Sequence, residues 1–227
     1  MHIGIIPMRS GSKRFKDKNK AILDGFPLWK RVVVKAVATM DMSYITTDYD
    51  DIKVCCNVAC AVIERPEHLR DGSTYRIDDV LIDIVKTHNI PENAFLHLFQ
   101  CTSPFTSIKT IEQCKKVLTS FENCDSVQSV VKIQNVFHEY SQREIIGEEI
   151  RFVNRVQRDK HYNSQKKPDR YAFAGYVACR VRSLLKHNNI WGNTSYPVIV
   201  DQYEAHDIDT ETDLRHAQAL IDSGIVV

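Results

Sequence analysis

The sequence predicts an α/β fold with a mostly parallel sheet, and two observations support this. Short apolar runs such as 2–7 and 94–99 end directly in polar loops, which is typical of buried strands in parallel sheets. Longer segments between such runs carry apolar residues at helical spacing, as in 28–40 and 74–88. Because strand, loop and helix alternate in this order, we expect a three-layer, Rossmann-like architecture.

The first part of the chain supplies most of these elements. The predicted strands cover residues 2–7, 44–47, 60–63, 94–99 and 126–131. The predicted helices cover about 28–40, 50–58, 74–88 and 107–121. Pro27 stands at the start of the first helix, a position that tolerates proline because its missing N–H would be unpaired there anyway.

The alternation stops near Lys132. Residues 133–169 are mostly polar, with a segment at 145–152 that resembles a small hairpin. We expect 133–169 to leave the sheet as an excursion that serves as a lid or as a dimer contact. Strands are expected again at 171–178 and 197–200, and a closing helix at 210–223 with Thr210 as its N-cap. The whole chain, 1–227, is therefore predicted to be a single domain.

Composition argues against several classes of function. The net charge is +1 and the pI is near 7.6, which does not favour a nucleic-acid or membrane-surface partner. No apolar run is long enough to span a membrane, and no signal-peptide core follows Met1. The seven cysteines are odd in number and contain no C-x-x-C pair. We therefore expect a reducing, cytoplasmic location without a zinc site.

The first strand ends in a strongly basic loop. Residues 1–20 carry six basic side chains against one acid, Asp17. The basic residues are Arg9, Lys13, Arg14, Lys16, Lys18 and Lys20. Ser10, Gly11 and Ser12 allow backbone N–H groups to approach an anion closely. The loop matches neither the Walker nor the G-x-G-x-x-G pattern, so it indicates either a polyphosphate site of another kind or a solvated basic loop.

Three polar loops follow strands at what should be one edge of the sheet, namely 8–20, 64–74 and 100–106. Ligands of open α/β sheets bind outside the carboxyl ends of the strands. Gln100 can bond a base edge through its amide, and Arg65 can hold a ribose or a phosphate. Ser73 or Thr74 can add a hydroxyl group. Each loop alone can be ordinary, but together they favour a nucleotide pocket.

Asp207 and Asp209 form a candidate magnesium site. They lie two residues apart, so in an extended segment both carboxylates face the same side. Carboxylate oxygens suit Mg²⁺ that is shared with phosphate oxygens. The alternative is that Asp209 and Glu211 only stabilise the start of the following helix. His97 lies in a strongly apolar strand, so we interpret it as a buried core histidine.

The segment 5–14, IIPMRSGSKR, followed by Lys18 and Asn19, resembles the N-terminal signature of the acylneuraminate cytidylyltransferases, the CMP-sialic acid synthetase family. Four later segments occur in the order of that family. They are 46–48 (TTD), 65–69 (RPEHL), 98–104 (LFQCTSP) and 207–214 (DIDTETDL). The resemblance covers nearly the whole chain. It implies a Mg²⁺-dependent homodimer that converts CTP and a 2-keto sugar acid to a CMP-sugar and pyrophosphate.

Carried over by position, the resemblance also implies roles for individual residues. Arg9, Ser12, Lys13, Lys18 and Asn19 would hold the phosphates and base of CTP, with Arg9, Lys13 and Lys18 as the catalytic cations. Arg65, Ser73 or Thr74, and Gln100 would complete the nucleotide site. Asp207 and Asp209 would bind the metal. The segment 133–169 corresponds to the part of the family that embraces the partner subunit.

The acceptor side departs from the family pattern. Ser164, Ala172 and Ala174 replace two arginines and an asparagine, and the 102–106 loop ends in Phe105-Thr106 without its arginine. Gln165, Lys166, Arg170 and Tyr171 are the residues expected to hold the acceptor, with Lys167 as another possible cation for its carboxylate. Two alternatives stay open: a cytidylyltransferase for another acidic sugar or a phosphonate, and a nucleotide-binding protein without turnover.

Overall fold

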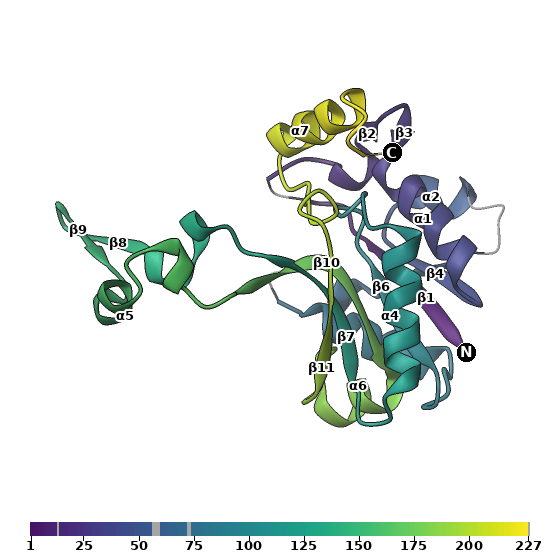
Figure 1. Ribbon diagram of the computed structural model, residues 1–227. Helices are drawn as coiled ribbons and strands as arrows, with labels where there is room; N and C mark the ends of the chain where they lie inside the picture. The colour runs from purple at the N-terminus through teal and green to yellow at the C-terminus, as the bar shows by residue number, and fades with distance from the viewer. Residues whose placement is uncertain (13, 56–59, 72–73, 227) are drawn as a thin grey trace.

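A computed structural model describes residues 1–12, 14–55, 60–71 and 74–226 of this chain. The described residues form a central seven-stranded sheet in the order β11-β7-β10-β6-β1-β4-β5 (Figure 1). Its strands are β1 (His2–Met8), β4 (Met42–Thr47), β5 (Cys60–Glu64), β6 (Phe95–Phe99), β7 (Ser126–Lys132), β10 (Tyr171–Arg180) and β11 (Ser195–Ile199). All neighbouring strands pair in parallel except that β10 is antiparallel to both β6 and β7. The predicted α/β fold with a mostly parallel sheet is confirmed.

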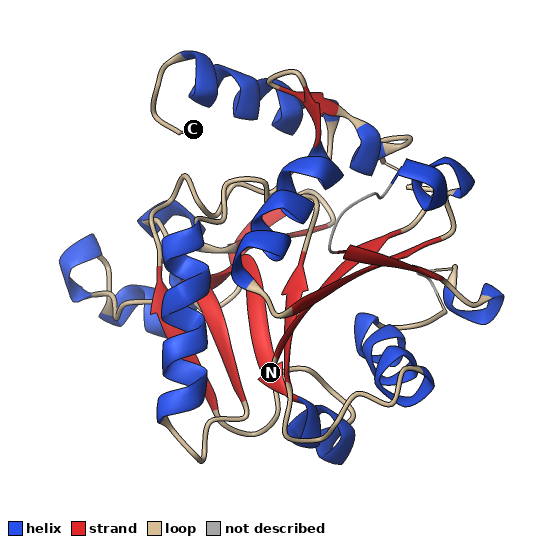
Figure 2. Cartoon of the chain, turned by 90° about the vertical axis from the view of Figure 1, so that its right-hand side faces the viewer, coloured by secondary structure: helices blue, strands red, loops and turns tan. Residues whose placement is uncertain are grey.

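Helices cover both faces of the sheet (Figures 1 and 2). The helices are α1 (Leu28–Thr39), α2 (Asp50–Cys55), α3 (Ile77–Thr87), α4 (Ile108–Ser120), α5 (Arg155–Lys160), α6 (Val181–His187) and α7 (Glu211–Asp222). Short 3-10 turns occur at Lys18–Lys20, Glu67–Leu69, Asn135–Phe137, Glu139–Ser141 and Ser164–Lys166. A two-stranded ribbon, β2 (Ile22–Leu23) with β3 (Phe26–Pro27), precedes α1.

The central strand β1 explains the layering. Its side chains alternate, so Ile6 and Met8 are buried with α1 and α4 in one apolar cluster. Ile3 and Ile5 are buried with α3 and α6 in a second cluster. Because β1 is covered on both faces, it reads in the sequence as a continuous apolar run.

Two helix starts are fixed by their N-cap residues. The Ser107 hydroxyl accepts a hydrogen bond from Thr110 N at 3.1 Å. Thr210 caps α7 as predicted, and its hydroxyl and the Asp213 carboxylate form a reciprocal capping box. These hydrogen bonds satisfy N–H groups that have no partner inside the helix.

Several predicted boundaries are wrong. The helix predicted from Thr74 begins at Ile77, because the Thr74 hydroxyl donates to Asp71 O at 2.9 Å in the preceding turn. The helix predicted at 50–58 is described only up to Cys55, and residues 56–59 lie outside the described residues. The sequence reasoning missed α5, α6 and the β2–β3 ribbon, since these elements are short and have weak periodicity.

Residues 133–169, called the arm from here on, project away from the sheet (Figure 1). A hairpin forms near the predicted place, with β8 (Arg143–Ile146) paired to β9 (Glu149–Phe152) and Gly147 at φ 62° in the turn. The arm exposes a set of large apolar side chains, each 50% to 77% accessible. They are Val136, Phe137, Ile145, Ile146, Ile150, Val153 and Val156.

No helix in the described part of the chain is long and apolar enough to cross a membrane.

His97 is a core histidine, as predicted. It is fully buried, and its two ring nitrogens lie 2.8 Å from His2 Nδ1 and 2.7 Å from the Tyr176 hydroxyl. Burial lowers the pKa of His97 well below its ordinary value of 6.5, and burial also lowers the pKa of His2. Both rings are therefore neutral in the folded protein at pH 7.

The first prediction concerns stability at acid pH. Below about pH 6.5, His97 and His2 are protonated in the unfolded chain but stay neutral in the folded protein. The free energy of unfolding should therefore fall as the pH drops below this value. Urea unfolding between pH 7.5 and pH 5 measures this slope. In His97→Phe the protein should be less stable by about 1–3 kcal/mol at pH 7.5, because the Tyr176 hydroxyl loses its partner, but the slope should be shallower. The exposed His68, changed to Gln, is the control, and an unchanged slope in His97→Phe would contradict the interpretation.

The second prediction concerns assembly. An arm with this much exposed apolar surface should be covered by a second copy, so we expect a homodimer in sedimentation at micromolar concentration. Ile145 and Ile150 face each other across the hairpin, and changing both to Asp should give monomers because buried carboxylates in an interface are strongly unfavourable. Val34→Asp on α1, also an exposed apolar position, should stay dimeric. A monomeric wild type would refute the prediction.

Candidate functional site

A cavity of about 410 Å³ lies where β1, β5 and β6 end. It is lined by Pro7, Arg9, Ser12, Lys18, Asn19, Arg65, Tyr75, Ile77, Leu98, Gln100, Cys101 and Thr102. The three predicted loops thus meet at one site, because the carboxyl ends of parallel strands share one edge of a sheet. Six predicted nucleotide residues line this cavity: Arg9, Ser12, Lys18, Asn19, Arg65 and Gln100.

Three other predicted residues are not in that set. Thr74 does not line the cavity, and its hydroxyl is engaged with Asp71 O in a turn. Lys13 and Ser73 lie outside the described residues.

The basic loop after β1 is shaped by two side chains. The Asp48 carboxylate, at the end of β4, accepts hydrogen bonds from Ser10 N at 2.7 Å and from the Ser10 hydroxyl at 2.6 Å. Burial by itself would raise the pKa of Asp48, but the hydrogen bonds from Ser10 outweigh it and the pKa is lowered. Asn19 Nδ2 donates to Arg9 O at 3.1 Å. The start of the loop is therefore fixed to the end of β4, and Asn19 ties the far part of the loop back to Arg9.

Arg65 brings a buried positive charge to the cavity. Arg65 is only 2% exposed. One guanidinium nitrogen donates to the Tyr75 hydroxyl at 3.0 Å and another to Thr46 O at 3.2 Å. Arg65 Nε makes no hydrogen bond within the described chain, and burial lowers the pKa of this guanidinium. In the described part of the chain no carboxylate lies at salt-bridge distance from Arg65. A buried cation of this kind favours an anionic ligand.

Lys18 connects the cavity to the predicted metal residues. Its ammonium group lies 2.7 Å from Asp209 Oδ1, and Arg14 lies 2.8 Å from Asp209 Oδ2. Ile208 is fully buried, and its N–H donates to Thr102 O at 2.8 Å. Asp207 is exposed on the other side of Ile208. The acidic segment is therefore fixed to the loop that carries Gln100, with Asp209 at the rim of the cavity.

Residues 3–209 match the family described as Cytidylyltransferase. The chain belongs to the cytidylyltransferase family. It is 25% identical over 221 residues to an N-acylneuraminate cytidylyltransferase of Streptococcus agalactiae serotype V, a match that covers 94% of this chain and 52% of that protein. The corresponding protein of serotype III is also 25% identical, over 223 residues. These relatives confirm the resemblance seen in the sequence, and the chain spans about half of their length.

Solved structures confirm the fold of this cytidylyltransferase. A CMP:2-keto-3-deoxy-manno-octonic acid synthetase complexed with CTP matches with a TM-score of 0.72 at 14% identity, over 98% of this chain and 99% of the other. The 4-diphosphocytidyl-2C-methyl-D-erythritol synthase of Anaerococcus prevotii matches with a TM-score of 0.65 at 12% identity, over 97% and 96% of the two chains.

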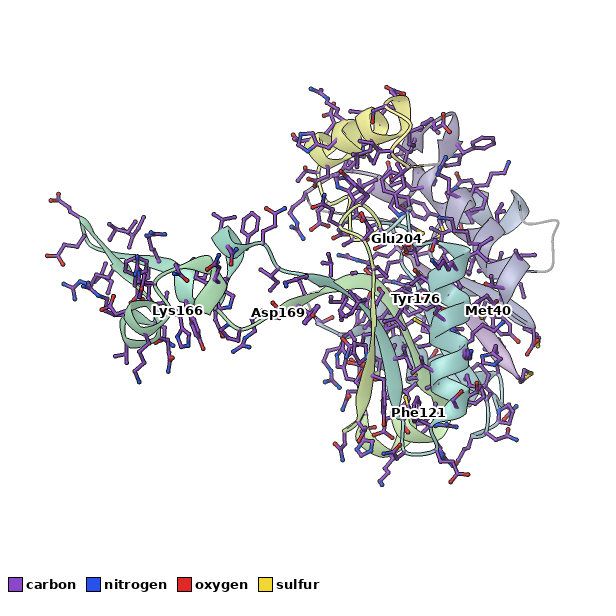
Figure 3. The ribbon with its side chains drawn as sticks, in the orientation of Figure 1. Met40, Phe121, Lys166, Asp169, Tyr176 and Glu204 are labelled. Carbon is purple, nitrogen blue, oxygen red and sulfur yellow. The ribbon has the colours of Figure 1, made fainter. Side chains whose placement is uncertain are left out.

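The predicted acceptor residues of this cytidylyltransferase lie elsewhere. Gln165 and Lys166 belong to a 3-10 turn in the arm, and Arg170 and Tyr171 lie where the arm rejoins the sheet. Lys166 donates to the Tyr162 hydroxyl at 3.2 Å, and Arg170 pairs with Glu139 at 2.7 Å. Figure 3 shows Lys166 out on the arm and Asp169 at its base. None of the four lines the 410 Å³ cavity at the ends of β1, β5 and β6.

The arm contains a cavity of its own, of about 240 Å³. Its lining includes four basic side chains and three aromatic rings: Arg143, Arg158, His161, Lys167, Tyr140, Phe152 and Tyr162. Arg143 lies over the Phe152 ring, with its guanidinium carbon 4.4 Å from the centroid. Of the cations predicted for the acceptor, Lys167 lines this cavity, whereas Lys166 and Arg170 do not.

Sequence reasoning missed two residues of the site. Tyr75 lines the cavity and orients Arg65. Its only sequence signal was its place directly after the 64–74 loop. Asp48 was noted as part of the 46–48 segment, but its hydrogen bonds to Ser10 depend on the pairing of β1 with β4.

Proposed function

We propose that this protein transfers the CMP group of CTP to a hydroxyl group of an acidic sugar, with release of pyrophosphate. The observation that carries the proposal is the cavity at the end of β1, where Arg9, Lys18 and Arg65 meet the amide of Gln100. Three cations suit a triphosphate, and an amide suits the edge of a base. Membership of the cytidylyltransferase family and the fold shared with a CTP-bound synthetase support this assignment.

The reaction is an in-line displacement at the α-phosphorus of CTP. The acceptor oxygen forms a bond to phosphorus, the bond to the β-phosphate oxygen breaks, pyrophosphate leaves, and the hydroxyl proton is released. Little covalent chemistry is needed from the protein, so positioning and charge neutralisation supply most of the rate. Lys18 and Arg9 hold the triphosphate and offset its charge, together with Lys13 as the remaining predicted cation of the loop.

Asp207 and Asp209 fit Mg²⁺ by their chemistry. Both offer hard oxygen ligands, and Asp209 lies at the rim of the cavity through its pair with Lys18. Two carboxylates with phosphate oxygens suffice for this ion. Mg²⁺ held by Asp207 and Asp209 would offset the negative charge of the triphosphate. Both oxygens of Asp209 are paired with Lys18 and Arg14 in the protein alone. The triphosphate attracts these two cations, so its arrival frees Asp209 to act as a ligand.

In a homodimer, residues of the second copy complete the site that binds the acceptor. A sugar acid needs a cation for its carboxylate, and the predicted acceptor residues Gln165, Lys166, Arg170 and Tyr171 lie in or beside the arm, away from the cavity of their own chain. They can therefore serve the cavity of a second copy. The replacements at Ser164, Ala172 and Ala174 favour an acceptor that differs from sialic acid, such as another acidic sugar or a phosphonate.

The third prediction tests the nucleotide. CTP should raise the melting temperature more than ATP, GTP or UTP, and Gln100→Ala should remove most of this preference. Loss of hydrogen bonds to the base is worth about 1–3 kcal/mol, or roughly tenfold to a hundredfold in affinity. Gln113→Ala, at an exposed position on α4, is the control. Equal stabilisation of the wild type by ATP and CTP would remove the cytidylyl assignment.

The fourth prediction tests the metal. Pyrophosphate release from CTP, with acidic sugars and phosphonates screened as acceptors, should require Mg²⁺ and accept Mn²⁺. Asp207→Asn and Asp209→Asn should lower turnover by roughly 100-fold, about 2.7 kcal/mol of transition-state stabilisation, with little change in melting temperature. Asp201→Asn in the same segment should behave like wild type. Coincident Mg²⁺ titrations for wild type and both variants would place the metal elsewhere.

A further inference from the structure

Lys35 is a partly buried lysine on α1 whose ammonium group reaches the loop that follows β6. Lys35 Nζ donates to Pro104 O and, at 2.9 Å, to Thr106 O. Within the described residues no carboxylate lies at salt-bridge distance from it. With Gln100, Ser103 and Tyr176 it lines a small enclosed space directly behind the nucleotide cavity. The ammonium group of this partly buried lysine therefore binds two backbone carbonyls of one loop.

That loop, residues 100–106, carries Gln100 and has no basic residue of its own. Pro104 O and Thr106 O would be left without a strong donor if the ammonium group were removed. Lys35 thus supplies the positive charge to the loop from another element.

The same loop is held from two further directions. Thr102 O accepts the hydrogen bond from Ile208 N, which ties the loop to the acidic segment. Gly175 on β10 comes so close that an added Cβ would lie 2.1 Å from the Ser103 hydroxyl oxygen. Glu204, between these parts, accepts hydrogen bonds from Ser107 N and the Thr110 hydroxyl at the start of α4. Figure 3 labels Tyr176 and Glu204 in this region. The loop that carries Gln100 is therefore attached to the segment that carries Asp207 and Asp209 and lies against β10.

We propose that Lys35 is a positioning residue of the nucleotide site, which sets the affinity for CTP by fixing the 100–106 loop without touching the ligand. The inference rests on the proposed function, because it takes CTP as the ligand of the cavity.

The charge of Lys35 can be followed separately. Burial, with Arg31 nearby, lowers its pKa to about 8, while Glu204 acts in the opposite direction. Tyr176 lines the same enclosed space, and burial raises its pKa well above the usual value, so it stays neutral near pH 8. Arginine and glutamate do not change charge near pH 8. The hydrogen bonds from Lys35 to Pro104 O and Thr106 O are strongest when Lys35 is charged. The affinity for CTP should therefore fall as the pH rises through about 8.

The fifth prediction compares CTP dissociation constants, measured by calorimetry at pH 7 and pH 9, for the wild type, Lys35→Met and Lys115→Met. Lys115 is a matched control because its ammonium group also donates to a backbone carbonyl, Thr39 O at 2.7 Å, but at the far end of α1. Lys35→Met should bind CTP roughly tenfold or more weakly at pH 7, with a smaller loss of affinity between pH 7 and pH 9. Lys115→Met should lose melting temperature but keep wild-type affinity and its pH dependence.

The outcomes separate the two levels of the proposal. If the wild type fails to bind CTP, the proposed function and this inference both fall. If the wild type binds CTP and Lys35→Met binds it equally well, only the role of Lys35 is refuted. If Lys35→Met does not fold, the wild type and Lys115→Met still test the inference. A wild-type affinity for CTP that is constant from pH 7 to pH 9 would overturn it.

Discussion

The parallel pairing of β1 with β4 and β6 is the constraint on which the rest of the structure depends. It places the ends of these strands at one edge, so that loops distant in sequence meet around one cavity. It also brings Asp48 beside Ser10, and the resulting hydrogen bonds shape the basic loop before any ligand is present. Preorganised groups of this kind need no rearrangement when a charged ligand arrives.

The concentration of positive charge at this edge needs its own compensation. Arg14 and Lys18 share the carboxylate of Asp209, while Lys20 pairs with Asp51 and lies 4.0 Å from the centre of the Tyr49 ring. The Arg14 and Asp51 side chains are exposed, and ion pairs with an exposed partner are weak and easily exchanged. The basic loop can therefore be stable in the protein alone and still bind a polyanion tightly. Arg65 differs, because it is buried and oriented by Tyr75 rather than neutralised by an acid.

The second half of the chain contains the one strand that breaks the parallel order of the described seven-stranded sheet. β10 runs antiparallel between β6 and β7, and its register shifts between Phe173 and Val177. Gly175, at φ 91°, lies in this irregular stretch and allows the close contact with Ser103. The same strand leads back from the arm, so one element connects the loop behind the nucleotide cavity with the apolar surface that we expect at the dimer contact. β10 therefore connects the arm to the part of the sheet that contacts Ser103.

The sequence by itself determined the layers of the fold and most of the nucleotide loops. Strand and helix periods are local properties, and the cations of residues 9–20 and Gln100 stand directly after apolar strands. Family motifs extended this to the cytidylyltransferase assignment, and Thr210 could be recognised as a cap from its neighbours alone. Only the tertiary structure decided the direction of β10, the absence of the predicted acceptor residues from the cavity lining, and the contacts of Tyr75, Asp48 and Lys35. The physical reason is that these features depend on contacts between distant parts of the chain: Lys35 and Thr106 are 71 residues apart, and Lys18 and Asp209 are 191 apart. No local pattern encodes such contacts, because they arise only when the path of the whole backbone brings the partners together.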